Sequence, residues 1–352
     1  MSAVDPPSPS AAPPRRGCGT SIPVRPDPCC PVHLEPLRRE GDALIGVARG
    51  ERYPIVDGIP VLIADRGERR AAAEVDWTKG TPEKSPLSFY NRLEDGYCRE
   101  ELVEEQRDLQ RWLGAATAAG PVLEIGSGKG ALQGLGGDYT ACDYSLTALR
   151  AHVRPEHGRV CASAERLPFA DGTFRFVFSI ATLEHVPGAG RAFAEIERVL
   201  APGGVAYLAP AWHCVQYNCE GIPVRPYRDL DLRQKLVKAS LPLRRTLLVK
   251  AAGTLPARVA RRALWAARPH PTDLRFEALR PDYERFWMSD SDAASRIDLH
   301  EGCLFFQSRG YEVLSPGRAA LQQILARHDP LVAKKPLHVG RAETLPDPPH
   351  PP

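Results

Sequence analysis

Apolar and polar residues alternate along the middle of the chain in a repeated strand and helix pattern. Short apolar runs predict strands near residues 121–126, 138–143, 158–162, 174–180 and 203–209. The segments between them have helical spacing, and the one at 191–200 ends at Pro202-Gly203-Gly204 as helices tend to. Such alternation predicts a parallel sheet that helices cover on both faces.

The pattern breaks at residues 211–290 and then returns. We expect a helix near 294–308, a strand at 311–314, a helix near 318–327 and a last strand at 330–333. The fold class is therefore α/β, a Rossmann-like, doubly wound and mostly parallel sheet of seven strands. Its core comprises residues 119–210 and 291–338, and residues 211–290 form a helical insertion that caps the substrate site.

The flanking segments have different compositions. Residues 1–28 are rich in Pro, Ala, Ser and Arg and predict a disordered leader, and residues 339–352 predict a disordered tail. Between 29 and 66, short apolar runs alternate with turns, which indicates a small β module. Residues 67–118 are highly charged, with apolar residues at helical spacing, and predict a helical linker.

Composition narrows the class of protein. No apolar run approaches the ~20 residues of a membrane-spanning helix, and the N-terminus lacks the apolar region of a secretory signal. We therefore expect a cytoplasmic protein. The nine cysteines are mostly scattered, which is typical of reduced thiols. The net charge of +3 is too small to indicate a polyanionic partner for the whole molecule.

The strongest chemical signal lies where the first core strand would pass into a helix. Glu124 there precedes three glycines, Gly126, Gly128 and Gly130, whose backbone can approach a ligand closely. Asp143 follows the loop at about the sequence spacing expected of an acid that binds a ribose, so the loop by itself is also compatible with NAD binding. The carboxylate of Glu124, however, can meet a ligand ammonium group, and NAD has none.

Further motifs follow the loop in order. They are Ala141–Ser145, Ser163–Phe169, Asp171–Phe174, Leu183–Val186 and Arg198–Gly204. Together with Val122–Gly130 they resemble the class I S-adenosylmethionine-dependent methyltransferases, of the methyltransferase type 11 kind. The resemblance implies a transferase whose cofactor is S-adenosyl-L-methionine.

The same resemblance assigns cofactor contacts. It places the methionine portion at Glu124, Gly126, Ser127 and Gly128, the ribose at Asp143, the adenine beside Ser163, Ala164 and Glu165, and adds Tyr144 and Ile180 to the cofactor site. Ser163 departs from the family, which usually has an Asp there, so its bond to the adenine amino group would be weaker. Arg175 also departs from the usual acidic residue, at a position that is mostly structural.

Methyl transfer needs a base only when the acceptor must lose a proton. His185 is the candidate base, because this loop faces the sulfonium in such a fold and histidine titrates near neutrality. A helix-capping role for His185 is the alternative. Trp212, His213 and Tyr217 follow the fifth strand and are candidate acceptor-site residues. The loop used for nitrogen methylation of adenine or glutamine amides is absent, which favours an oxygen or small-molecule acceptor.

The small N-terminal module resembles the zinc-ribbon-like domain of the Trm112 type, best at Tyr53–Leu62. Two Cys-x-x-Cys pairs would hold zinc in such a domain. Here the first pair is reduced to Cys30 and His33, and the second is absent. We therefore expect a degenerate, metal-free module that packs on the catalytic domain.

The insertion is basic between Arg225 and Arg268. Its cations include Arg233, Lys235, Lys238, Arg244, Arg245, Lys250, Arg258, Arg261 and Arg262, interleaved with Leu and Val. Such a cap would hold an anionic acceptor or rest on a membrane surface, and the alternative is a solvated basic face.

The sequence therefore predicts methylation of a small-molecule, glycan or lipid-linked acceptor, at oxygen. An RNA-directed methyltransferase and a non-catalytic scaffold of the same fold remain alternatives. The sequence makes nucleic acid the less favoured partner and leaves the oligomeric state open.

Overall fold

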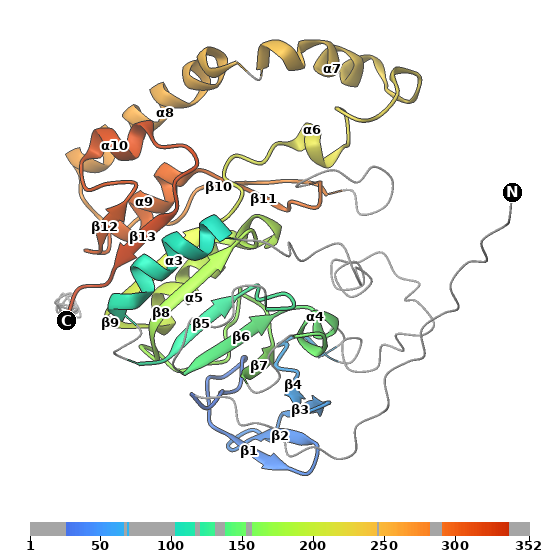
Figure 1. The fold of residues 1–352 in the computed structure, drawn as a ribbon, viewed down its shortest axis with the longest axis vertical. Coiled ribbons are helices and arrows are strands. Elements are labelled where there is room, and N and C mark those ends of the chain that lie inside the picture. Colours follow the sequence, from blue (N-terminus) through green and yellow to red (C-terminus); the bar gives the residue numbers. More distant parts are fainter. Residues whose placement is uncertain are drawn as a thin grey trace, which may run out of the picture.

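A seven-stranded sheet forms the centre of the computed structural model (Figure 1). The structure describes residues 26–66, 69, 103–116, 120–130, 138–152, 157–244, 246–281 and 291–337. The strands are β5 (Val122–Ile125), β6 (Tyr139–Asp143), β7 (Gly158–Cys161), β8 (Phe174–Ile180), β9 (Leu200–Ala209), β12 (Glu312–Ser315) and β13 (Leu331–Lys334). The predicted leader up to residue 25, most of the linker and the tail from 338 lie outside the described residues.

Strand order confirms the predicted Rossmann-like, doubly wound sheet. The order is β12-β13-β9-β8-β5-β6-β7, in which β9 through β7 run parallel and β13 is antiparallel to both its neighbours. The chain leaves β5 toward β6 on one side and returns to β8 on the other. The carboxyl ends of β5 and β8 are therefore the switch point, where ligands bind in open α/β sheets.

Helices cover both faces of this sheet. On one face α3 (Val103–Ala116) packs Leu109 and Leu113 over β8 and β9, and α4 (Leu146–Arg150) packs Leu146 over β6 and β7. On the other, α5 (Ala189–Val199) and α9 (Leu299–Gln307) pack Phe193 edge-on against Phe305, 5.6 Å between ring centroids. Each buried aromatic ring contributes about 2 kcal/mol of apolar burial. The helix expected directly after the glycine loop falls at residues outside those described.

The boundary between α5 and β9 differs slightly from the prediction. The helix ends at Val199 and the strand begins at once at Leu200, so Pro202-Gly203-Gly204 lies inside β9 rather than in a turn. The strand tolerates this because its register with β8 shifts there, between Phe174 and Phe176.

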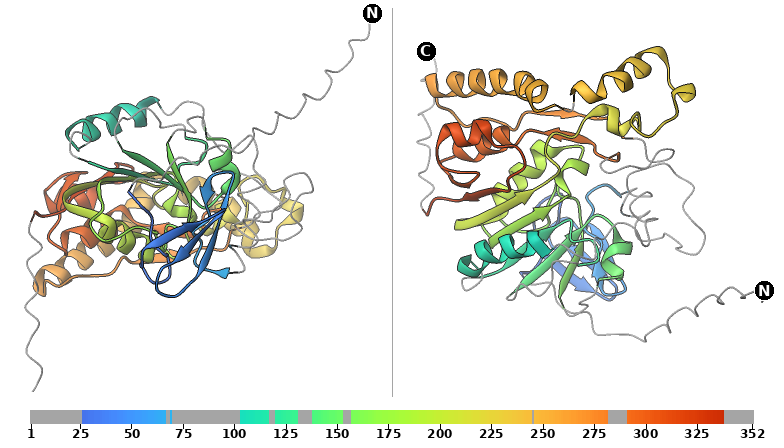
Figure 2. Two further views of the ribbon diagram at one scale, coloured as in Figure 1. Left: turned by 90° about the horizontal axis from the view of Figure 1, so that it is seen from below. Right: turned by 45° about the horizontal axis from the view of Figure 1, so that its top comes forward.

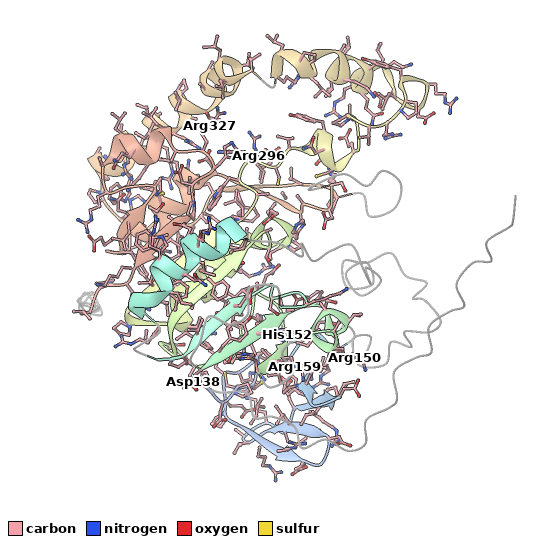
Figure 3. The ribbon with its side chains drawn as sticks, in the orientation of Figure 1. Asp138, Arg150, His152, Arg159, Arg296 and Arg327 are labelled. Carbon is pink, nitrogen blue, oxygen red and sulfur yellow. The ribbon has the colours of Figure 1, made fainter. Side chains whose placement is uncertain are left out.

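A four-stranded antiparallel sheet forms the N-terminal module. Its strands are β1 (Leu37–Glu40), β2 (Ala43–Gly46), β3 (Arg52–Val56) and β4 (Ile59–Pro60). Beyond β4, Val61 bridges Cys161 of edge strand β7, and the Leu62 N–H donates to the Cys161 carbonyl at 2.7 Å. Arg150 at the end of α4 faces this module, 2.7 Å from the Asp57 carboxylate (Figure 3). The module thus covers an edge that would otherwise stay unpaired.

The insertion occupies the end of the molecule farthest from that module (Figures 1 and 2). Its elements are α6 (Gln216–Cys219), η3 (Tyr227–Asp229), α7 (Leu232–Arg244), α8 (Leu247–Ala267) and β10 (Phe276–Ala278). Strand β11 (Ser295–Ile297) and helix α10 (Ala320–Leu325) follow it in the chain. Strand β11 pairs with β10 and adjoins η2 (Leu183–His185), where the Ala294 N–H donates to the Glu184 carbonyl at 2.8 Å. The returning chain is therefore fastened to the loop that follows β8.

Three arginines of the insertion are buried rather than exposed. Arg258, Arg261 and Arg262 on α8 are between 4% and 8% exposed. Arg261 pairs with the Glu301 carboxylate at 3.2 Å, and Arg262 donates to the amide oxygens of Gln307 and Gln323. Their inclusion in an exposed basic face was wrong, because partners on α9 and α10 occupy these guanidinium groups.

Within the described residues, every helix is too short or too polar to cross a lipid bilayer. The cytoplasmic location stays a prediction.

Candidate active site

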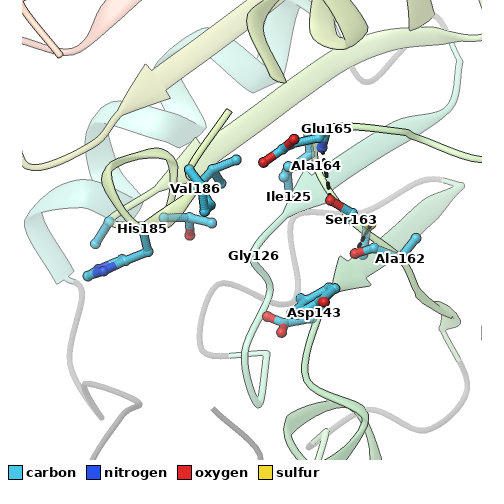
Figure 4. A pocket seen from close by; sticks show the side chains of 14 residues that line it. Ile125, Gly126, Asp143, Ala162, Ser163, Ala164, Glu165, His185 and Val186 are labelled. Atoms are coloured by element: carbon cyan, nitrogen blue, oxygen red, sulfur yellow. Dashed lines mark hydrogen bonds between the residues drawn. The ribbon is translucent and has the colours of Figure 1, made fainter. Parts of the chain in front are cut away.

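A cavity of about 290 Å³ opens at the carboxyl ends of β5, β6, β7 and β8 (Figure 4). It is lined by Ile125, Gly126, Cys142, Asp143, Tyr144, Ala162, Ser163, Ala164, Glu165, Ala181, Thr182, His185, Val186 and Pro187. Asp143 and Ser163 lie on one side and His185 on the other, with its ring turned away from Asp143. This position coincides with the switch point of the sheet.

Gly126 brings the backbone to the cavity wall. Its φ is +75°, and a Cβ there would lie 2.0 Å from the Thr182 hydroxyl oxygen. The Gly126 N–H donates to the Cys142 carbonyl at 2.8 Å, which holds the loop against β6. Only glycine combines this dihedral with this close approach.

Asp143 ends β6 with its carboxylate in the same cavity. One oxygen accepts from the Gly128 N–H at 2.8 Å and the other from the Ser145 N–H at 2.7 Å. Burial raises the pKa of this carboxyl, and the backbone hydrogen bonds oppose that shift. Each oxygen keeps acceptor capacity for a further donor such as a ribose hydroxyl.

The loop also contains a polar atom that suits a ligand. Ser127 is 5% exposed, and among the described residues its hydroxyl has no hydrogen-bond partner. Buried hydroxyl groups are normally bonded. Neither Ser127 nor Gly128 lines the cavity itself, although both belong to the loop that bounds it.

Glu124 does not reach the cavity. It lies on the opposite side of β5 from Ile125 and accepts a hydrogen bond from the Tyr139 hydroxyl. Burial raises the pKa of Glu124 to about 8, and the Tyr139 hydrogen bond opposes that rise. The predicted contact with a cofactor ammonium group does not fit this arrangement, because alternate side chains of a strand point to opposite faces. Ile180 likewise lies outside the cavity lining.

The residues predicted to border the adenine lie together at the cavity. Ser163, Ala164 and Glu165 all line the cavity, together with Tyr144. The Ser163 hydroxyl accepts from the Glu165 N–H at 3.2 Å, and the Glu165 carboxylate accepts from the Gly188 N–H at 2.8 Å. Arg191 adds a charged partner to Glu165. These bonds fix the loop after β7 against the start of α5.

His185 sits between two carboxylates. Its Nδ1 lies 3.1 Å from Asp292 and its Nε2 lies 3.7 Å from Glu184. Burial lowers the pKa of His185, but the Asp292 hydrogen bond and the Glu184 charge outweigh it and raise the pKa to about 9. The ring therefore holds its proton at neutral pH. A base role at that pH does not fit this environment, whereas a cationic donor does.

We expect the pKa of His185 to be measurable by NMR titration of its ring C–H signal, with a midpoint near pH 9. Because this pKa exceeds the ordinary 6.5, the stabilisation from its ion pairs is full below pH 6.5 and is lost as pH rises through about 9. Asp292→Asn should lower the midpoint, and His185→Gln identifies the signal by removing it. A midpoint at or below 6.5 in the wild type would contradict this environment.

The three residues predicted at the acceptor site do not lie in one cavity. Trp212 is buried and its indole N–H donates to the Asp329 carbonyl at 3.0 Å. His213 contacts Arg258 at 3.0 Å, and burial lowers its pKa to about 4. Neither lines the first cavity. Tyr217 lines a second one, of about 600 Å³, between α6 and α7.

Sequence reasoning missed the cavity position of Thr182 and the pairing of Asp292 with His185. Thr182 lies two residues after the predicted strand, so its position in the cavity could have been predicted from the loop that follows that strand. Asp292 comes from the far side of the insertion, and nothing in the local sequence points to its pairing with His185.

Comparison with known proteins shows which family the motif series resembles. Residues 123–208 match the model described as a methyltransferase domain. Over these residues the chain is similar to the methyltransferase family. The matched region contains β5 to β9 almost entirely, and so provides most of the cavity wall. This similarity supports S-adenosyl-L-methionine as the cofactor.

Curated relatives align with parts of the chain. The demethylmenaquinone methyltransferase of Beutenbergia cavernae is 36% identical over 101 residues, which are 26% of this chain and 42% of that protein. An uncharacterised methyltransferase of Mycobacterium sp. (strain JLS) is 31% identical over 134 residues, 36% of this chain and 51% of its own length. The chain thus spans about half or less of the length of these relatives.

Solved structures resemble the chain more distantly. YcgJ from Bacillus subtilis is 15% identical, covers 66% of this chain and 99% of its own, and has a TM-score of 0.32. CalS10 from Micromonospora echinaspora, described as an amino pentose methyltransferase, is 22% identical over 31% of this chain and 50% of its own, with a TM-score of 0.28. At these TM-scores the assignment rests on the sequence matches.

Proposed function

We propose that the chain is an S-adenosylmethionine-dependent methyltransferase that acts at oxygen on a small-molecule, glycan or lipid-linked acceptor. The coincidence of the methyltransferase domain with a cavity at the switch point carries this proposal. Gly126 supplies close backbone approach there, and Asp143 supplies a carboxylate with remaining acceptor capacity.

When bound, the cofactor supplies a methyl group on a positively charged sulfur. The chain's own residues would then hold the cofactor and orient it. Asp143 would bind the ribose hydroxyls, Ser163 and Ala164 would border the adenine, and the Gly126 backbone would lie against the cofactor. Apolar lining from Ile125 and Val186 excludes water from the cavity. Alignment of acceptor and methyl group in a dry pocket can supply much of the rate enhancement.

The proton on His185 favours one kind of acceptor. A His185 that already carries its proton cannot take a proton from a neutral hydroxyl, whereas an oxygen that arrives already ionised, such as a carboxylate or phenolate, requires no base. The anionic oxygen takes the methyl group and becomes neutral. Asp292 positions His185 and keeps it cationic. We therefore infer an acidic oxygen acceptor.

A small-molecule acceptor is favoured over RNA. Three of the cations that suggested a nucleic-acid surface, Arg258, Arg261 and Arg262, are buried against α9 and α10. Phosphate binding needs accessible cations. One relative is named for action on demethylmenaquinone, which supports the small-molecule class.

We also infer that the N-terminal module is a degenerate Trm112-like domain with a packing role. The Cys30 sulfur lies 3.0 Å from the Tyr53 hydroxyl and 3.5 Å from the Glu51 carboxylate. Among the described residues, no three His, Cys, Asp or Glu side chains form a group that could hold a metal.

The test is turnover with an acceptor panel. The wild-type chain is incubated with S-adenosylmethionine and phenols, carboxylic acids, sugars or amines, and release of S-adenosylhomocysteine is followed by mass spectrometry. We expect release with acidic oxygen acceptors, a methyl ester or ether as product, and a fall of about tenfold or more in Asp143→Asn. Methylation of amines alone would contradict the oxygen assignment.

A further inference from the structure

Helix α7 presents an apolar stripe to solvent. Leu232, Leu236 and Leu243 are 76%, 65% and 63% exposed. At 100° per residue their positions differ by at most about 40°, so they share one face of the helix. Leu247 and Leu248 at the start of α8 are also exposed, at 72% and 84%. Large aliphatic residues grouped in this way mark a binding surface rather than ordinary scatter.

The opposite face of α7 is the one that packs on the protein. Leu241 is 6% exposed, and Val237 and Ser240 line the cavity of about 600 Å³ beside Tyr217 and Ile222. Leu232 and Leu243 therefore lie on the side away from this cavity, and Leu236 lies at its edge. Helix α7 itself lies at the outer end of the molecule (Figure 2).

Cations flank the stripe, and acids are absent from it. Residues 232–267 include no Asp or Glu. Arg233, Lys235 and Arg244 are exposed and lie on the borders of the leucine face. Because Arg258, Arg261 and Arg262 are buried farther along α8, the exposed charge gathers around α7 and the α7–α8 junction.

Exposed leucines flanked by cations indicate which kind of partner this face of α7 can bind. A second copy docked face to face would bring arginine against arginine, which is repulsive. Nucleic acid would match the cations but leave the leucines in water. An anionic lipid surface satisfies both, because headgroups pair with the cations while the leucines enter the acyl boundary.

We propose that α7 and the first turn of α8 form an interfacial anchor for an anionic membrane. This deepens the proposed function, on which it rests for the lipid-linked nature of the acceptor. The helix lies in the membrane surface with Leu232, Leu236 and Leu243 inserted. The cavity on its inner face, lined by Arg233 and Tyr217, then adjoins the lipid surface and can receive an acceptor from it.

Co-sedimentation of the full chain with vesicles tests the anchor. Vesicles of phosphatidylcholine alone are compared with vesicles that contain phosphatidylglycerol. The stripe variant Leu232→Ser/Leu236→Ser/Leu243→Ser is compared with the matched triple Leu264→Ser/Leu321→Ser/Leu325→Ser. The control leucines are also exposed, at 68%, 65% and 53%, on α8 and α10.

We expect binding to the anionic vesicles, a loss of about tenfold or more in the stripe variant, and wild-type binding in the control. Both variants should bind S-adenosylmethionine as the wild type does, so failure of the anchor is distinguishable from failure of the methyltransferase assignment. Equal losses in the two triples, binding that ignores lipid charge, or a stripe-dependent dimer without vesicle binding would each overturn the anchor.

Discussion

Replacing Gly126 with alanine should lower the affinity for S-adenosylmethionine by about tenfold or more. The added Cβ would lie 2.0 Å from the Thr182 hydroxyl oxygen, and φ of +75° would strain any other residue. Because Thr182 also lines the cavity and donates to the Ile180 carbonyl at 3.0 Å, it cannot move without changing the site. Isothermal titration calorimetry with the cofactor measures the effect.

Gly172→Ala is the matched control. Gly172 has φ of +64°, but its added Cβ would meet only ordinary contacts at 3.7 and 3.8 Å, away from the cavity. It should cost about 1 kcal/mol of stability from backbone strain and leave cofactor affinity unchanged. Equal affinities in the two variants would show that the Gly126 loop does not contact the cofactor.

Removal of the Arg258 side chain should destabilise the protein by about 3–5 kcal/mol. Its guanidinium donates to the Ile324 and Ala326 carbonyls at 2.6 and 2.7 Å and pairs with Asp298 at 3.0 Å, while being almost fully buried. Arg258→Ala leaves two carbonyls without this donor and the Asp298 carboxylate without its cationic partner. The change in free energy of unfolding is measured by urea denaturation.

Arg318→Ala provides the comparison, since Arg318 forms an exposed ion pair with Glu312. Such surface pairs contribute about 0–1 kcal/mol. If Arg258→Ala were no more destabilising than Arg318→Ala, the buried arginine would not hold α8 on α9 and α10.

Local patterns predicted most of the fold. Strand β8 occurs at 174–180 as expected, and the other core strands match within a few residues. The loop motifs also placed Gly126, Asp143 and Ser163 at one cavity, because consecutive parallel strands end at the same edge of the sheet. These inferences need only short-range sequence and a known topology.

Other features depend on contacts between distant segments. Glu124 was given a cofactor role from its distance to the glycine loop, but strand alternation turns it toward Tyr139. The pKa of His185 depends on Asp292, which the insertion separates from it in sequence. A count of cations likewise could not show that Arg258 faces inward while Arg233 faces solvent.

Titration of the wild-type chain with S-adenosylmethionine, and separately with NAD, tests the central claim most directly. The cavity at the switch point, with Gly126 and Asp143 on its wall, predicts saturable binding of one S-adenosylmethionine per chain, competition by S-adenosylhomocysteine and no comparable binding of NAD. Asp143→Asn should weaken that binding by about tenfold or more. Binding of NAD in preference to S-adenosylmethionine, or of neither, would contradict the account.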